Sequence, residues 1–167
     1  MTFEHLAAGR LFQIGIVVPD LWQALDLYSS ALGLGPWIGF HFTSDNVRDF
    51  TYRGRPAEYS IDIALTVEPS PQVELVQVHG ENSLYHEWIA AHGYGVQHLG
   101  VRVDDISAID RELSARYEVL QAGYGYGAAG DGAFVYYDTH DDFGVILECI
   151  QVPAVRRAPD FEWPAAR

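Results

Sequence analysis

The stretch QIGIVVPD at residues 13–20 recurs later in the chain as HLGVRVDD at residues 98–105. Each copy is a short run rich in β-branched residues, with glycine at its third position and aspartate at its eighth. Self-similarity between two separate parts of a chain is the sequence signature of a duplicated structural unit. We therefore expect two copies of one module, each opening with a β-strand.

A helix is expected directly after each copy. Asp20 and Asp105 stand where an N-cap residue belongs, and Gly33 stands where the first helix should end. Apolar residues then recur at helical spacing, which predicts an amphipathic helix in each module. These residues are Leu21, Leu25, Tyr28 and Leu32 in the first module, and Ile106, Ile109, Leu113 and Tyr117 in the second.

Three strand-like runs follow each predicted helix, at residues 38–43, 58–67 and 72–78 in the first module and at residues 117–122, 133–139 and 144–152 in the second. The chain is thus interpreted as two tandem β-α-β-β-β modules, residues 6–80 and 90–153, within one domain of residues 1–153. The predicted fold class is α+β, with a curved, partly open eight-stranded sheet. A connecting helix ended by Gly93 is expected within residues 81–95, and residues 154–167 form a tail whose Phe161 and Trp163 dock on the domain or on a second subunit.

Composition limits the classes of partner and compartment. The net charge of −13 argues against nucleic acid as a partner, because a polyanion would be repelled. Cys149 is the only cysteine, which excludes an internal disulfide and fits a reducing compartment. The first ten residues contain no long apolar segment, so we expect no signal peptide, no membrane span and a cytoplasmic protein.

One glutamate, Glu148, lies within ILECIQV (146–152), a run that otherwise predicts a buried strand. An ionised carboxylate there needs a partner, because burying an unpaired charge costs several kcal/mol. An Arg or Lys partner, or a solvated strand face, would satisfy it. However, VELVQV (73–78) aligns with LECIQV (147–152), so that Glu74 occupies the position equivalent to Glu148. The recurrence points to a shared role for the two carboxylates.

Side-chain alternation places Gln13 and His98 on the strand face that the helices do not cover. If a pseudo-twofold axis relates the modules, the pairs Gln13/His98 and Glu74/Glu148 converge as one amide, one imidazole and two carboxylates. This set suits a divalent cation with room for water. Two alternatives stay open: His98 as a hydrogen-bonded core histidine, and Gln13 as a residue that orients water beside the metal.

The chain resembles the vicinal oxygen chelate superfamily, the group of glyoxalases, bleomycin-resistance proteins and extradiol dioxygenases, over about residues 10–153. The stretches that carry the resemblance are FQIGIVVPDLWQALDLYSSALGLGPW, TYRGRPAEYS, QVELVQ, VQHLGVRVDD and VYYDTHDDFGVILECI. They are most similar to glyoxalase I and methylmalonyl-CoA epimerase. The resemblance implies that Gln13, Glu74, His98 and Glu148 bind a metal. Glyoxalase I of the Gln, Glu, His, Glu type matches all four positions, whereas the epimerase has His in place of Gln13 and Gln in place of Glu74.

A metal held in this way would polarise a carbonyl compound while a neighbouring base removes its α-proton. Glu148 is the first candidate for that base and Glu74 the second. The expected activity is an isomerase, an epimerase or a glyoxalase-type lyase that uses Zn, Ni, Co or Mn and acts on a small carbonyl compound such as a thioester or hemithioacetal. A homodimer is expected, and the ligands could come from one chain or be shared across the dimer.

Two other classes of function remain as alternatives. An iron(II) dioxygenase requires two histidines and one carboxylate around the metal, a pattern from which Gln13 departs. A ligand-binding or resistance protein on the same fold has no use for four metal ligands. These alternatives predict an oxygen requirement and an absence of metal dependence, respectively.

Three further features carry weaker functional hypotheses. GYGAAG (125–130) fits the dinucleotide pattern but precedes a strand instead of a helix, so we expect a loop, with a role as a lid as one possibility. Arg48, Arg53 and Arg55 form either a solvated loop or a binding site for a carboxylate or phosphate. The remaining histidines that show no paired spacing are expected on the surface or in packing contacts: His41, His79, His86, His92 and His140.

Overall fold

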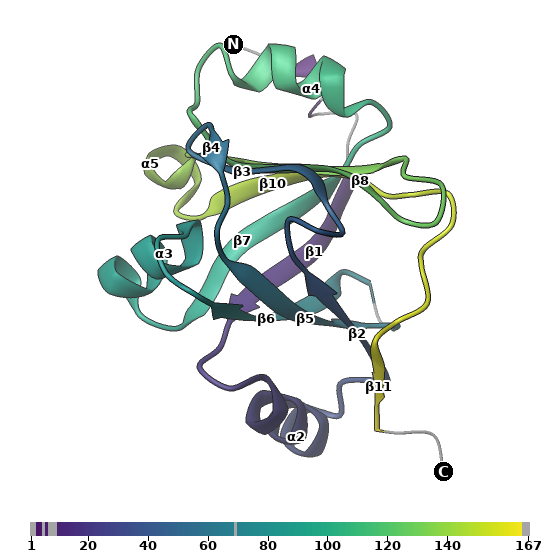
Figure 1. Cartoon of the computed structure of the whole chain (residues 1–167). Coiled ribbons are helices and arrows are strands. Elements are labelled where there is room, and N and C mark those ends of the chain that lie inside the picture. The colour runs from purple at the N-terminus through teal and green to yellow at the C-terminus, as the bar shows by residue number, and fades with distance from the viewer. Residues whose placement is uncertain (1–2, 5, 7–9, 69, 165–167) are drawn as a thin grey trace.

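The computed structural model describes residues 3–4, 6, 10–68 and 70–164, and these residues form one curled sheet of eleven strands with four helices (Figure 1). The first half contains β1 (Arg10–Val17), α2 (Leu21–Leu32), β2 (Trp37–Phe42), β3 (Arg48–Tyr52), β4 (Arg55–Pro56), β5 (Ser60–Thr66) and β6 (Gln72–His79). The second contains α3 (Leu84–His92), β7 (Gly95–Arg102), α4 (Ile106–Leu113), β8 (Val119–Tyr126), β9 (Gly132–Tyr137), α5 (His140–Phe143), β10 (Ile146–Gln151) and β11 (Phe161–Trp163).

The two halves meet at an antiparallel pair of strands, β1 and β7, in the middle of the sheet. On one side the order continues β6, β5, β2, and on the other β10, β9, β8. In each half the first strand pairs in parallel with the last: β1 with β6, and β7 with β10. The expected two-module α+β sheet is therefore confirmed.

Helix caps form where the sequence predicts them. The side chain of Asp20 accepts a hydrogen bond from the backbone N–H of Gln23, and Gly33 ends α2 in the left-handed conformation at φ 68°. The side chain of Asp105 caps α4 in the same way. A third helix, α3, begins after Ser83, whose side chain caps it, and runs to His92 as the predicted connection between the halves.

The helices α2 and α4 each cover the outer face of their own half and lie on opposite outer sides of the curled sheet (Figure 1). Under α2, Ile16 and Val18 of the first strand region pack against Leu21 and Leu25. Under α4, the equivalent residues of the second half pack against that helix: Val101 and Val103 contact the cluster of Ile106, Ile109 and Leu113. Because these residues alternate along the strands, the side chains between them are directed into the concave face.

Three short strands, β3, β4 and β11, extend the eight that the sequence predicts. β3 follows β2 in the chain but pairs with β8 at the other end of the sheet order, and β4 pairs with β3. Val47 and Phe50 contribute to the concave-face core while residues 44–46 are exposed, so the β2–β5 connection runs over the concave side and links β2 to the β8 end of the sheet order. β11 pairs with the outer strand β2 at the opposite end of the order. The concave interior is thereby enclosed on most sides.

Within the part of the chain that the structure describes, no helix has the length and apolar character needed to cross a membrane.

Candidate metal centre

The four predicted ligands lie on the four central strands, all directed into the concave interior. The exposed fractions of Gln13, Glu74, His98 and Glu148 are 4%, 6%, 0% and 5%. The strand register explains the convergence, because Gly15 is paired with both His98 and Glu74, and Gly100 is paired with both Gln13 and Glu148. Each glycine therefore lies between a residue from each half, as a pseudo-twofold axis between β1 and β7 requires.

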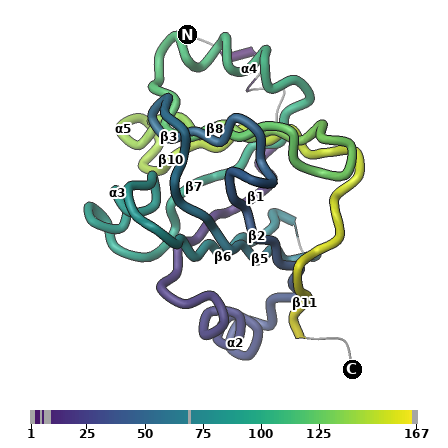
Figure 2. Tube along the Cα trace, viewed as in Figure 1, coloured from purple at the N-terminus to yellow at the C-terminus, as the bar shows by residue number. Residues whose placement is uncertain are grey.

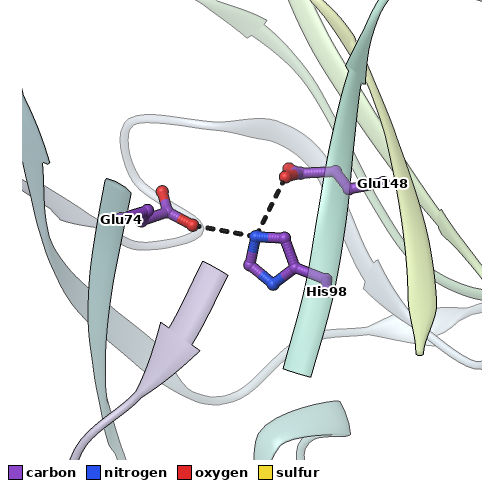
Figure 3. A group of neighbouring side chains, drawn as sticks. All are labelled: Glu74, His98 and Glu148. Carbon is purple, nitrogen blue, oxygen red and sulfur yellow. Dashed lines mark ion pairs between the residues drawn. The ribbon is translucent and has the colours of Figure 1, made fainter. Parts of the chain in front are cut away.

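His98 lies between the two carboxylates (Figure 3). Its Nε2 is 3.1 Å from Glu74 Oε2 and 3.4 Å from Glu148 Oε2. One ligand atom from each of these three residues lies within 4.8 Å of the other two. Such a compact group of buried donors has the size of a metal coordination shell.

The hydrogen bonds around His98 leave its Nε2 available as a ligand. Its Nδ1 lies 2.6 Å from Gln97 Oε1, so Nδ1–H donates to that oxygen and fixes the tautomer. Nε2 then presents its lone pair to two carboxylates, an arrangement that is repulsive unless a proton or a cation lies between them. Four buried atoms that could bind a metal have no hydrogen-bond partner among the described residues: Gln13 Oε1, Glu74 Oε2, His98 Nε2 and Glu148 Oε2. These atoms fit a divalent cation, because buried polar atoms in folded proteins almost always have a partner.

Two glycines make room for the site. A Cβ atom at Gly15 would lie 1.8 Å from His98 Cε1 and 2.0 Å from His98 Nε2, so the imidazole ring lies directly on the Gly15 backbone. At Gly100 a Cβ atom would lie 2.8 Å from Gln13 Cβ and 3.0 Å from Gln13 Oε1. Glycine at the third position of each repeat therefore allows the side chain of the other half to pack across the strand pair.

Gln13 is held by the strand beside it. Its Nε2 donates to Gln72 Oε1 at 3.4 Å, and Gln72 Nε2 donates to the backbone oxygen of Thr66 at 2.8 Å. This chain of amides determines which end of Gln13 is free, and it leaves Oε1 as the atom without a partner. An amide oxygen is a neutral and weak ligand, so Gln13 adds coordination without adding negative charge.

Burial and mutual charge shift the titration of the site. Burial raises the pKa of Glu148 to about 8; the His98 charge opposes this rise and the Glu74 charge adds to it. Burial lowers the pKa of His98, but the Glu74 and Glu148 carboxylates outweigh burial and leave that pKa raised overall. Without a cation, the site therefore tends to hold protons; a bound cation would replace them.

Gln13, Glu74 and Glu148 form the floor of a pocket with a cavity volume of about 80 Å³, enough for a few waters or a small acyl group, and His98 contacts the two carboxylates of that floor. Its walls are mainly aromatic and aliphatic, and include Phe40, Phe42, Ile61, Ile63 and Phe134. Tyr136 also lines the pocket. The planes of the Tyr136 and His98 rings are at 85° to each other, and the ring centroids are 5.2 Å apart. An apolar pocket with a few convergent polar groups is the usual form of a small-molecule site.

Of the other predicted features, the arginine cluster lies outside the pocket lining, whereas Tyr126 and Gly127 of the glycine-rich loop line the pocket. Arg53 forms ion pairs with Glu87 and Glu118, and Arg48 donates to the backbone oxygen of Gly130, so these arginines hold loops together. Gly125 and Gly127, within GYGAAG, have positive φ angles and pack closely against Arg48 and Pro153. The glycine-rich loop is thus fixed between two other segments.

The histidines without paired spacing make local contacts. His41 and His79 both contact Asp62, at 2.5 and 2.7 Å, on partly exposed surface. His92 and His140 pack with Trp88, and His86 lies 2.7 Å from the Ser83 hydroxyl. Surface and packing positions agree with the expectation for these residues.

Sequence reasoning missed several residues around the site. Gln97 and Gln72 orient His98 and Gln13, and the only signal for them is their place in the sequence, one residue before His98 and two residues before Glu74. Tyr136 stands opposite Glu148 in the β9–β10 register, which the sequence does not reveal. Arg156 and Arg157 of the tail also line the pocket, and no pattern in the sequence connects them with it.

Comparison with known proteins agrees with this architecture. The chain is similar in structure to a hypothetical protein from Bacillus halodurans C-125, with a TM-score of 0.64, 20% identity, and 90% of this chain and 99% of that chain covered. It is also similar to methylmalonyl-CoA epimerase from Mycobacterium tuberculosis, with a TM-score of 0.61, 25% identity, and coverage of 86% and 88%. A variant of the Streptomyces coelicolor methylmalonyl-CoA epimerase in complex with 2-nitronate-propionyl-CoA has a TM-score of 0.60, 20% identity, and coverage of 89% and 97%.

No curated protein sequence matches the chain significantly. The sequence profile of the glyoxalase/bleomycin resistance protein/dioxygenase superfamily matches residues 12–137, which include three of the four central donors: Gln13, Glu74 and His98. With the profile covering most of the chain and the curled two-module sheet in place, this protein belongs to the glyoxalase/bleomycin resistance protein/dioxygenase superfamily.

Proposed function

We propose that this protein is a divalent-metal-dependent enzyme that transfers a proton at the carbon next to a carbonyl group, as an isomerase, an epimerase or a glyoxalase-type lyase. One observation carries the proposal: four buried ligand atoms without hydrogen-bond partners converge, and three of their residues, Gln13, Glu74 and Glu148, line a largely apolar pocket. A binding protein for apolar compounds would not need this group, because unpartnered buried polar atoms cost stability.

Gln13, Glu74, His98 and Glu148 would hold the ion. Two carboxylates balance the charge of a divalent cation, and one imidazole with oxygen donors suits Zn, Ni, Co or Mn. When bound, the ion would supply Lewis-acid polarisation of a substrate carbonyl. Gln97 and Gln72 would keep His98 and Gln13 in orientation for that role.

Glu148 is the proposed base that takes the α-proton and returns it. Burial raises the pKa of Glu148 to about 8 in the metal-free site, and a bound cation would lower that pKa and keep the carboxylate ionised, so that it can accept a proton. Burial also raises the pKa of Tyr126 and Tyr136 above the usual tyrosine value, so these hydroxyls keep their protons at neutral pH. Glu148 is therefore better suited than either pocket tyrosine to exchange a proton, and Glu74 is the second candidate.

The pocket walls contribute by excluding water. The aromatic and aliphatic side chains over the floor lower the local dielectric and strengthen the interaction of charged groups with a developing enolate. Tyr136 belongs to a buried polar chain in which Tyr85 donates to the Tyr136 hydroxyl at 3.4 Å, and Gln121 donates to Tyr85 at 3.4 Å. This chain holds the wall beside Glu148 in place.

Acyl thioesters are the first substrate class to test, because structurally similar epimerases have been solved with acyl-CoA compounds. Hemithioacetals are the second class, because the Gln, Glu, His, Glu set matches one type of glyoxalase I. The two classes share the feature that the proposal needs, an acidic C–H beside a polarisable oxygen.

The test is exchange of the α-proton into deuterated water, followed by NMR, with the metal-loaded protein and a 2-oxo compound, a hemithioacetal and an acyl thioester as probes. We expect exchange above the metal-free control for at least one probe. Absence of exchange for all three classes with fully metal-loaded protein would contradict the proposal.

The same assay under strict anaerobiosis separates this function from that of an iron dioxygenase. His98 is the single histidine among the four converging residues, whereas the dioxygenase centre requires two. Exchange should therefore proceed unchanged without O₂. A requirement for both Fe²⁺ and O₂ would move the protein to the dioxygenase class.

A further inference from the structure

The C-terminal segment at residues 153–160 runs from the end of β10, beside the β8–β9 connection, to β11 (Figure 2). Three of its residues, Pro153, Arg156 and Arg157, line the pocket. Its first part is fixed to that connection: Ala128 N donates to the Val155 oxygen at 2.9 Å, and Ala154 N donates to Asp131 Oδ2 at 3.0 Å. Gly127 approaches Pro153 so closely that a Cβ atom there would lie 2.4 Å from the proline ring.

The other end of the segment is fixed to β2. Asp160 N donates to the Gly39 oxygen at 2.8 Å, and His41 N donates to Asp160 Oδ2 at 2.7 Å. Phe161 packs on Trp22 with a centroid distance of 4.7 Å, so the tail docks on its own domain. Residues between these two anchors are therefore held at a defined place over the pocket.

Two arginines lie between the anchors, and their surroundings differ. Arg157 is fully engaged: it pairs with Asp160 at 2.7 Å, donates to the His41 oxygen at 3.0 Å, and lies 5.1 Å over the ring of Phe40. Arg156 also lines the pocket and is partly buried, yet it forms no ion pair with any described residue.

The Arg156 charge acts within the pocket. Burial raises the pKa of Tyr126; the Glu148 carboxylate raises it further, while the Arg156 guanidinium opposes the rise. The tyrosine thus responds both to the floor of the pocket and to the arginine at its mouth. A guanidinium held in a partly buried place without a counter-ion is suited to a bidentate oxyanion.

Resting on the proposed function, we propose that Arg156 binds an oxyanion, either a carboxylate or a phosphate, on the part of the substrate that lies at the pocket mouth while its carbonyl lies at the metal centre. The chain carries a net charge of −13, which repels anions in general. Arg156 would therefore select an anionic substrate that places its negative charge at this one position.

The test is calorimetric titration of the metal-loaded protein with two matched pairs of probes. The first pair is 2-oxoglutarate against 2-oxopentanoate, which differ by a terminal carboxylate. The second pair is 4′-phosphopantetheine against pantetheine, which differ by one phosphate group. The variants are Arg156→Met, Arg156→Lys, and Arg111→Met as a control that removes an exposed arginine of α4.

We expect the wild type and Arg111→Met to bind the member with the additional carboxylate or phosphate about tenfold or more tightly than its partner, in at least one pair. Arg156→Met should remove that preference without weakening the partner that lacks the additional group, Arg156→Lys should retain part of it, and added salt should reduce it. The pair that shows the effect identifies the oxyanion as carboxylate or phosphate.

The inference is overturned if the wild type favours neither probe with the additional group, or if Arg156→Met keeps the wild-type preference. Binding is measured without turnover, so the outcome is separate from that of the proton-exchange assay. A preference that depends on Arg156, in a protein without exchange activity, would support the oxyanion site and contradict the proposed function. Exchange activity without such a preference would support the proposed function and contradict the oxyanion site.

Discussion

The two halves of the sheet place four donors by the same backbone arrangement but supply them with different chemistry. The first half contributes Gln13 and Glu74, and the second contributes His98 and Glu148. In both halves a glycine lies beneath the other half's donor. Only the second half places an imidazole nitrogen within 3.4 Å of both carboxylates, and burial raises the pKa of its Glu148 to about 8.

The positions of the four site residues and their chemical roles therefore have separate origins. The duplicated register determines where the groups meet, whereas the residue type determines what each can do there. We infer that the second half carries the stronger ligand and the principal base, and that the first half completes the charge and the coordination. Each prediction below substitutes equivalent positions in the two halves and compares the effects.

The largest effect is expected for His98→Ala against Gln13→Ala. Loss of His98 removes the central nitrogen donor, so affinity for Co²⁺ should fall by about 10²-fold or more, since even loss of a residue behind a ligand costs 10–100-fold. Gln13→Ala should cost less, because an amide oxygen is a neutral donor. Visible absorption of the Co²⁺ complex measures both. Equal losses in the two variants would remove the asymmetry between the halves.

The second comparison is Glu148→Gln against Glu74→Gln. Glu148→Gln keeps the shape and one oxygen donor but removes the basicity, so α-proton exchange should fall by about 10²-fold or more. Glu74→Gln should reduce exchange less. Metal content is measured on the same samples. A Glu148→Gln variant that keeps its metal and exchanges at the wild-type rate would show that Glu148 is a ligand only, with the base at Glu74 or elsewhere.

The third comparison uses the glycines. Gly15→Ala puts a methyl group into the His98 ring, while Gly100→Ala meets Gln13 Cβ at 2.8 Å. Overpacking of this kind typically costs about 1–3 kcal/mol, and we expect Gly15→Ala at the upper end because the ring cannot move without leaving Gln97. Chemical denaturation gives the free energy of unfolding. Greater destabilisation by Gly100→Ala would contradict the contact described here.

The smallest effect concerns pH in the metal-free protein. Burial favours the protonated form of Glu148, whose pKa rises from 4.5 to about 8, so the folded state holds a proton that the unfolded state releases. The melting temperature should therefore fall as pH rises from 4.5 towards 8, and the raised pKa of His98 acts in the same direction. Glu148→Gln should flatten this dependence, and saturating metal should do the same. An equally steep fall in Glu148→Gln would assign the effect to other groups.

The central strand pair and the positions of the four site residues can be predicted from the sequence repeat and from the alternation of side chains along each strand. QIGIVVPD and HLGVRVDD predict the central strand pair, and the alternation of Ile16 and Val18 with Gly15 and Val17 predicts which face the helix covers. The convergence of the four donors follows from the pseudo-symmetry of the two copies. Their role as metal ligands stays a prediction.

The remaining features depend on tertiary contacts between segments far apart in the chain. The pairing of β3 with β8 joins residues 48–52 to the second half, and nothing local to so short a strand specifies a partner. Gln97 became part of the site only through the ring orientation of His98. Arg156 reached the pocket because β11 pairs with β2, and a three-residue strand gives almost no periodic signal.

The most direct test of the central claim is metal stoichiometry. Metal-free protein is titrated with Zn²⁺, Ni²⁺, Co²⁺ and Mn²⁺ by calorimetry, and the bound ion is counted by mass spectrometry of the native protein. The control is His79→Ala, which alters the surface contact with Asp62, a second place where histidines and a carboxylate meet closely. We predict about one tightly bound ion per chain, kept in His79→Ala and lost in His98→Ala. Failure of every ion to bind, or an ion lost in His79→Ala and kept in His98→Ala, would contradict the metal centre at Gln13, Glu74, His98 and Glu148.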